Sequence, residues 1–75
     1  MLRIRLGNHL HTALLCEFLR GAGVGVERTS DPDLLSAWLP GAPSPEHERR
    51  ELTQYVETWL RLNPGAEAEV ARAAY

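Results

Sequence analysis

The sequence has no excess of basic residues and no long apolar run, and each absence argues against a class of protein. No apolar stretch approaches the length of a membrane span, and residues 1–5 are not followed by the apolar segment of a signal peptide. All eight basic residues are arginines, set against ten acidic residues, so the formal net charge is −2. Nucleic-acid binders carry a basic footprint instead. We therefore expect a cytoplasmic protein that binds neither nucleic acid nor membrane.

The sequence has one cysteine and three histidines, so few side chains are suited to metal or redox chemistry. Because Cys16 is alone, an intramolecular disulfide and a cysteine-cluster metal site are excluded. His9 and Cys16 share a helix face but lie two turns apart, about 10 Å along the axis, and His11 projects elsewhere. The ligands of one ion must converge on a point, and no sequence pattern places a base beside Cys16. We expect no metal, no cofactor and no enzymatic activity.

The 75 residues make one small domain, residues 1–75, near the low end of the sizes that fold alone. The hydrophobic content of 44% is ordinary for a globular chain. A domain of this size has little stability to spare, and dimerisation is a common way to bury more surface. We therefore expect a homodimer or a complex with a protein partner.

The clearest element is a helix at residues 45–62. Ser44 is a good N-cap because its hydroxyl can accept a hydrogen bond from a free amide of the first turn, and Pro45 suits the first helical position. The Asn-Pro-Gly sequence of residues 63–65 ends the helix. The apolar residues recur at the spacing of one helix face, which predicts an amphipathic helix packed on a core. They are Leu52, Tyr55, Val56, Trp59 and Leu60.

Three further segments alternate apolar and polar residues, which predicts half-buried strands at residues 2–6, 24–28 and 66–70. The alanines of the last segment also fit a continued helix. Between the first two we expect a helix at residues 9–20, with Asn8 as its N-cap. The apolar stripe predicted for this helix consists of Leu14, Leu15, Phe18 and Leu19, extended by Leu10 or His11 and by Ala22.

Residues 31–39 fit two interpretations. Asp31 as N-cap, with Pro32 at the first helical position, predicts a short helix. In the other interpretation, residues 29–33 form a turn and residues 34–39 form a strand. The strand is favoured because it completes the order βαββαβ and provides a sheet on which both helices can pack. Leu35, Ala37 and Leu39 would then face the core, and Ser36 and Trp38 would face outward.

The order βαββαβ is that of the ferredoxin-like plait, an α+β fold with a four-stranded antiparallel sheet and two helices on one face. In its usual strand order, the first strand lies between the third and the fourth. The open sheet face would then carry Arg3 and Arg5 opposite Glu67 and Glu69, as a cross-strand charge ladder. Trp38 would lie on the other side of the same arginines, within reach of a cation–π contact.

The first half of the chain also resembles the opening of ACT domains. The strand LRIRL at residues 2–6 is followed by a Gly7-Asn8 break, and FLRGAGVGV occupies residues 18–26. In that family a leucine, three residues and a glycine lead into an apolar-alternating second strand. The resemblance implies a ferredoxin-like fold, side-by-side dimerisation and an amino acid bound near the loop after the first strand, here Gly7, Asn8 and His9.

Trp38 beside Arg3 and Arg5 on an open sheet is a combination typical of protein interfaces. The same arrangement suits a platform on which RNA bases stack, but the acidic balance and the lack of a second aromatic residue on the sheet count against it. We therefore expect a non-enzymatic binding or self-association module that uses the open sheet face. The alternative is a small-molecule sensor of ACT type, with its ligand near Asn8 and His9.

Overall fold

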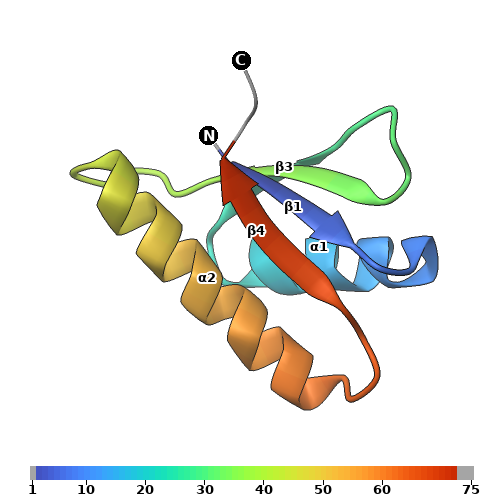
Figure 1. The fold of residues 1–75 in the computed structure, drawn as a ribbon. Helices are drawn as coiled ribbons and strands as arrows, with labels where there is room; N and C mark the ends of the chain where they lie inside the picture. Colours follow the sequence, from blue (N-terminus) through green and yellow to red (C-terminus); the bar gives the residue numbers. More distant parts are fainter. Residues whose placement is uncertain (1, 73–75) are drawn as a thin grey trace.

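A computed structural model describes residues 2–72, the last of them by its backbone alone, as an antiparallel sheet with two α-helices (Figure 1). The four strands lie in the order β2-β3-β1-β4. This arrangement is compatible with a ferredoxin-like fold. The elements are β1 (Leu2–Leu6), the 3-10 helix η1 (His9–His11), α1 (Thr12–Gly21), β2 (Gly25–Arg28), β3 (Leu34–Trp38), α2 (Pro45–Leu62) and β4 (Ala68–Arg72).

Helix α2 has the bounds that its sequence signals predict. The Ser44 side chain accepts a hydrogen bond from the His47 amide at 3.1 Å, and Pro45 opens the first turn. At the other end, the Asn63 side chain donates to the Trp59 carbonyl at 2.9 Å. Gly65 then takes a φ of 93°, a left-handed conformation that favours glycine. Both ends of this helix are therefore determined by local chemistry.

Helix α1 begins later than expected, at Thr12 rather than at residue 9. Asn8 does act as a cap, but its side-chain oxygen accepts from the Leu10 amide, only two residues on. This tight turn closes the 3-10 helix η1 instead of starting an α-helix. The Thr12 hydroxyl donates to the Pro32 carbonyl at 2.7 Å and anchors the true start of α1 to the β2–β3 connection.

The predicted apolar stripe of this first helix is wrong in part. Leu10 and Leu14 are 69% and 51% exposed, whereas Thr12 and Cys16 are buried together with Leu15. Because the hydroxyl of Thr12 is held against Pro32, the helix turns Thr12 and the residue one turn later, Cys16, toward the sheet. Leu10 and Leu14 consequently lie on the solvent side.

Residues 34–38 form a strand, so the helical interpretation of residues 31–39 is wrong. The Leu34 amide donates to the Asp31 carbonyl at 3.1 Å, which closes a turn before the strand begins. Leu35 and Ala37 are fully buried, as the alternation predicts, while Trp38 is half-buried on the other face. Pairing of this strand with both β1 and β2 outweighs the local capping signals.

Both helices pack on one face of the sheet, because a single core joins alternate strand residues to one stripe from each helix. Figure 1 shows the sheet lying across the two helices. The core residues are Leu2, Ile4, Leu6, Leu15, Cys16, Leu19, Val24, Val26, Leu35, Ala37, Leu52, Val56 and Trp59. The opposite sheet face carries no helix within residues 2–72.

Strand β4 spans Ala68–Arg72 rather than residues 66–70. The turn after α2 is longer than predicted, because the Ala66 amide still donates to the Asn63 carbonyl at 3.0 Å. Arg5 consequently faces Glu69, and Arg3 faces Ala71. Of the predicted ladder of two arginines opposite two glutamates, only Arg5 opposite Glu69 is therefore present, and the prediction of a glutamate opposite Arg3 is wrong.

No helix within residues 2–72 combines the length and apolar character needed to cross a membrane.

Candidate functional site

The open sheet face is a mixed surface built from the residues that point away from the helices. Directly paired residues of antiparallel strands point to the same side, so the pairing defines its rows. One row runs from Glu27 through Ser36 and Arg3 to Ala71. The next row contains Leu34, Arg5 and Glu69, and Trp38 lies at one corner, paired with Gly25. The predicted site residues Arg3, Arg5 and Trp38 therefore do share this face.

Arg3 occupies the centre of the face without a partner. Its side chain is half-buried, and its Nε is buried with no hydrogen-bond acceptor among the residues that the structure describes. Its neighbours on either side, Ser36 and Ala71, are small and carry no charge. An arginine side chain has five N–H donors and no acceptor, so Arg3 retains donors that can bind an external carboxylate.

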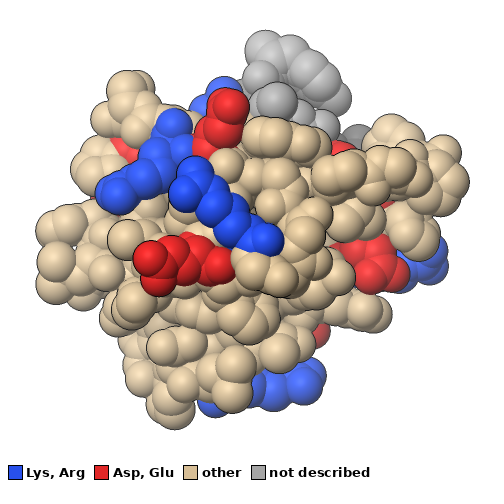
Figure 2. Space-filling view, turned by 180° about the vertical axis from the view of Figure 1, so that it is seen from behind, with Lys and Arg blue, Asp and Glu red and all other residues tan. Residues whose placement is uncertain are grey.

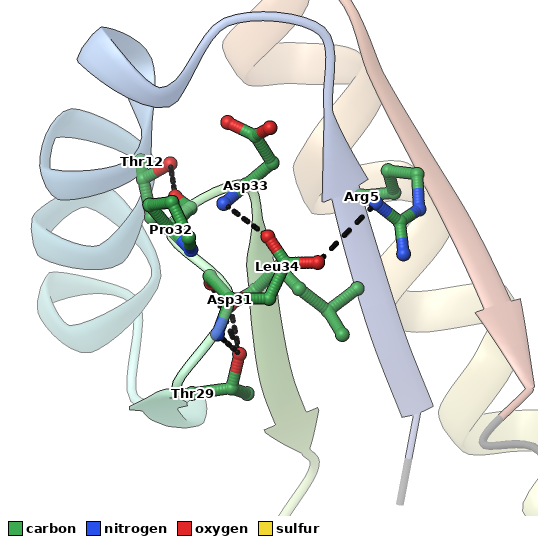
Figure 3. Close-up of polar contacts among 7 residues, drawn as sticks. All are labelled: Arg5, Thr12, Thr29, Asp31, Pro32, Asp33 and Leu34. Carbon is green, nitrogen blue, oxygen red and sulfur yellow. Dashed lines mark hydrogen bonds and ion pairs between the residues drawn. The ribbon is translucent and has the colours of Figure 1, made fainter.

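Arg5 has a partner, but not the predicted one. Its guanidinium forms an ion pair with the Asp31 carboxylate at 3.6 Å (Figure 3). Glu69 is the residue that faces Arg5 across the strand pair. The side chains of Arg5 and Asp31 are 60% and 41% exposed. An ion pair this exposed contributes little to stability. The ion pair connects β1 to the β2–β3 loop, and Glu69 has no ion pair among the side chains that the structure describes.

Trp38 packs on the β2 backbone rather than on an arginine. A β-carbon placed at Gly25 would lie 2.1 Å from the Trp38 ring, so the indole lies directly over that glycine. No cation–π contact joins Trp38 to an arginine within the described part of the chain, and this prediction was wrong. A glycine inside a strand often marks a close approach of this kind, so Gly25 was the signal in the sequence.

The loop between β2 and β3 is held by its own polar groups. The Thr29 hydroxyl donates to the Leu34 carbonyl at 3.0 Å and accepts from the Asp31 amide. The Asp31 carboxylate in turn accepts from the Asp33 amide at 2.9 Å (Figure 3). Asx and Ser/Thr turns of this kind fix a loop without a hydrophobic contact. The position of Asp31 next to Arg5 is therefore set by the loop.

Asp33 lies beside the end of β1, near the loop expected to bind a ligand. Its carbonyl accepts from the Leu6 amide at 2.8 Å, and one of its carboxylate oxygens, Oδ1, is buried without a partner. In Figure 3 its side chain extends toward the connection between β1 and α1. Asn8 uses its side-chain oxygen to cap η1, and His9 is exposed. Sequence reasoning missed Asp33, because its proximity to this loop results from strand pairing.

A shallow hollow of about 320 Å³ lies next to Gly7, at the start of the same connection. It is formed where the end of β1 meets the start of β4. Its lining residues are Arg5, Leu6, Gly7, Glu67, Ala68 and Glu69. The hollow therefore contains one of the predicted site residues, Arg5, but neither Asn8 nor His9.

The candidate metal ligands His9, His11 and Cys16 lie on η1 and α1. No group of three histidine, cysteine, aspartate or glutamate side chains in residues 2–72 could hold a metal ion. Cys16 is a buried free thiol in the core. His11 packs edge-on against Trp59, with ring centroids 6.1 Å apart and an interplanar angle of 71°.

Charges of both signs are interspersed on the side of the molecule turned away in Figure 1. Figure 2 shows arginines next to acidic side chains there, with uncharged surface around them. A mixed pattern of this kind does not produce the single-sign field that steers a polyanion.

Comparison with known proteins gives no match: no family model, no curated protein and no solved structure matches this chain. The function must therefore be inferred from the geometry of the open face and of the β1–α1 connection.

Proposed function

We propose that this protein is a ferredoxin-like plait that acts without catalysis, as a module that docks a protein partner on its open sheet face. The observation that carries the proposal is Arg3, an arginine at the centre of that face with a buried Nε that has no acceptor. An outside carboxylate cannot reach the buried Nε, but the terminal NH2 groups of the same guanidinium are not among the buried unpaired atoms. A partner that supplies a carboxylate can therefore bind the guanidinium through these groups.

The surroundings of Arg3 fit a protein ligand. Trp38 and Leu34 are half-buried on the same face and offer apolar surface on either side along β3. Tryptophan and arginine are the residue types most enriched in interface hot spots. Glu27 and Glu69 flank the face and would repel a nucleic-acid backbone. The partner that fits is therefore a protein segment with one acidic and one apolar side chain.

The test compares two charge-matched variants. Arg3→Gln removes the central guanidinium, and Arg61→Gln removes an exposed arginine near the end of α2. Immobilised wild type and each variant are exposed to a lysate of the source cells, and each protein retained by wild type is then purified and titrated by calorimetry. We expect Arg3→Gln to weaken binding about tenfold or more and Arg61→Gln to leave it unchanged.

Trp38→Ala provides a second variant of the same face and should also weaken binding. Equal affinity of wild type and Arg3→Gln for every recovered protein would overturn the proposal. Circular dichroism of each variant separates loss of binding from loss of the fold.

A small-molecule sensor is the second candidate, and Asp33 is the observation that favours it. The Asp33 carboxylate lies beside the β1–α1 connection, and its second oxygen, which is not among the buried unpaired atoms, can accept a hydrogen bond from the ammonium group of an amino acid. A thermal-shift screen of amino acids and nucleotides at millimolar concentration tests this candidate. A ligand that raises the melting temperature of wild type but not of Asp33→Asn supports it, and no shift with any ligand removes it.

A further inference from the structure

Strand β4 is an edge of the sheet, and its pairing with β1 shows which backbone groups are free. The Gly7 amide donates to the Glu67 carbonyl at 2.9 Å, in the register that the strand pair continues. In an antiparallel pair, hydrogen-bonded and non-bonded residues alternate. Glu67, Glu69 and Ala71 therefore direct their backbone N–H and C=O groups toward β1. The intervening Ala68, Val70 and Arg72 direct theirs away from the sheet.

The other side of β1 agrees with this assignment. The Leu6 amide donates to the Asp33 carbonyl at 2.8 Å, so Leu6 is bonded to β3 and not to its β4 neighbour, Ala68. The outward backbone groups of Ala68 and Val70 accordingly have no strand partner within residues 2–72. Unpaired edges of this kind bind a further strand.

The β4 edge lacks two of the features that usually block such pairing, a proline and a bulge. The strand contains no proline, and its register with β1 is unbroken over five pairs, so no bulge twists the edge away. The other edge is less suitable. Strand β2 has only four residues, and it is preceded by Val24, whose amide is already bonded to the Leu19 carbonyl.

We propose that β4 pairs antiparallel with β4 of a second copy of this chain, with Val70 on the two-fold axis. This register pairs all five residues of each strand: Val70 faces Val70, Ala68 faces Arg72, and Glu69 faces Ala71. Each of the three outward-bonded pairs can exchange two hydrogen bonds. The sheets of the two copies then continue into one another, and the interface is isologous.

Electrostatics disfavours the registers shifted toward the start of the strand. Shifting the axis to residue 69 places Glu69 opposite Glu69, and shifting it to residue 68 places Glu67 opposite Glu69. Like charges directly opposite each other destabilise a strand pair. A shift the other way, to residue 71, pairs only residues 70–72 of the strand, so it forms fewer hydrogen bonds. With Val70 on the axis, Glu69 faces the small uncharged Ala71, and the Val70 side chains meet on the helix side of the sheet. The open face of each copy stays free, so this inference goes beyond the proposed function and does not depend on it.

The first experiment blocks the edge without disturbing the monomer. Because the Val70 amide points outward, Val70→Pro removes a donor of the edge and leaves the pairing with β1 intact. Val70→Ala is the matched control, because it removes the same side chain but retains the donor. Light scattering should give twice the chain mass of 8.4 kDa for wild type and for Val70→Ala, and the single mass for Val70→Pro. A wild type that is monomeric at millimolar concentration overturns the proposal.

The second experiment tests the register and does not depend on the proline variant folding. Directly opposed residues of a bonded pair have Cα atoms about 5.5 Å apart, within the range of a disulfide. Val70→Cys should therefore form a covalent dimer on mild oxidation, faster than Ala68→Cys or Glu69→Cys. The native Cys16 is buried, so wild type should not cross-link. Cross-linking that is fastest at position 68 or 69, or absent at position 70, overturns the proposed pairing.

Discussion

Leu14 and Leu15 are adjacent in sequence but differ completely in environment. Leu15 is fully buried against the sheet, and Leu14 is 51% exposed. Truncating a buried leucine removes its transfer free energy and leaves a cavity, whereas an exposed one loses little. We expect Leu15→Ala to lower the free energy of unfolding by about 2–5 kcal/mol and Leu14→Ala to change it by less than about 0.5 kcal/mol. Urea denaturation of both variants measures the difference. Similar losses for the two would contradict the assigned helix face.

Gly25 is the residue on which the position of Trp38 depends. A β-carbon there would meet the indole ring, so Gly25→Ala forces the ring to move and should lower stability by about 1–3 kcal/mol. In a Trp38→Ala background the same change should cost much less, because the obstacle is gone. Gly21, which ends α1 with open space around it, is the control. Gly21→Ala should raise the free energy of unfolding by about 0.5–1 kcal/mol. An equal cost of Gly25→Ala in both backgrounds would show that the ring does not oppose it.

At the scale of the residue, the sequence predicts the face of a side chain better than its partner. The alternation in β1 and β3 correctly places Arg3, Arg5 and Trp38 on the open face, because each pleat reverses direction. The partners of these residues depend on register and on loop conformation. Arg5 pairs with Asp31, which the β2–β3 loop brings close, and Trp38 bends over Gly25 rather than toward an arginine.

At the scale of the element, Glu48 connects α2 to the end of β3. Its carboxylate accepts a hydrogen bond from the Leu39 amide at 3.1 Å. Burial raises the pKa of Glu48, but this hydrogen bond is among the contacts that lower it, and the net effect is a lowered pKa. A carboxyl whose pKa is lower in the folded state stabilises the fold above its unfolded pKa, about 4.3, and this contribution disappears as the pH falls through the folded pKa.

Glu48→Gln should therefore lower the free energy of unfolding at pH 7, and the difference from wild type should shrink as the pH falls below about 4.3. Urea denaturation at pH 7 and pH 3 measures both values. Glu46→Gln, an exposed change in the same turn, serves as control and should show a smaller difference at pH 7. A Glu48→Gln difference that stays constant between the two pH values would contradict the assignment.

Helix α2 and strand β4 differ in how well the sequence predicts their bounds. Helix α2 starts and ends where Ser44 and Asn63 direct it, because capping involves residues within one turn. Strand β4 begins two residues later than the alternation suggests, since alternation alone does not determine where pairing with β1 begins. In residues 31–39 capping favoured a helix, and the long-range pairing of β3 prevailed.

At the scale of the whole molecule, one core on one side of the sheet accounts for the stability of a small chain. The Cα radius of gyration is 11.2 Å. The apolar core lies between the sheet and the two helices. The sequence predicts this layering, because its apolar stripes need a common surface. It does not predict a partner, because an open face and a free strand edge have the same residue pattern whether or not they are occupied.

The proposed dimer has a consequence for the whole molecule that a monomer cannot reproduce. When a folded dimer unfolds to two chains, its stability depends on protein concentration by mass action. A tenfold increase in protein concentration stabilises the folded dimer by about 1.4 kcal/mol, which is about 0.7 kcal/mol per chain. For domains of this size, 1 kcal/mol shifts the melting temperature by about 4–8 °C. The melting temperature of wild type should therefore rise by about 3–6 °C per tenfold increase in concentration above the dissociation constant.

Differential scanning calorimetry over a hundredfold range of concentration measures this slope. Val70→Pro lacks one outward N–H of the β4 edge and should melt at a temperature independent of concentration, whereas Val70→Ala should keep the slope of wild type. Arg3→Gln changes the open face but not the edge, so its slope should also match wild type. A concentration-independent wild type would remove the dimer and leave the open-face proposal standing. If the melting temperature instead depends on concentration in Val70→Pro but not in Arg3→Gln, self-association takes place through the open face.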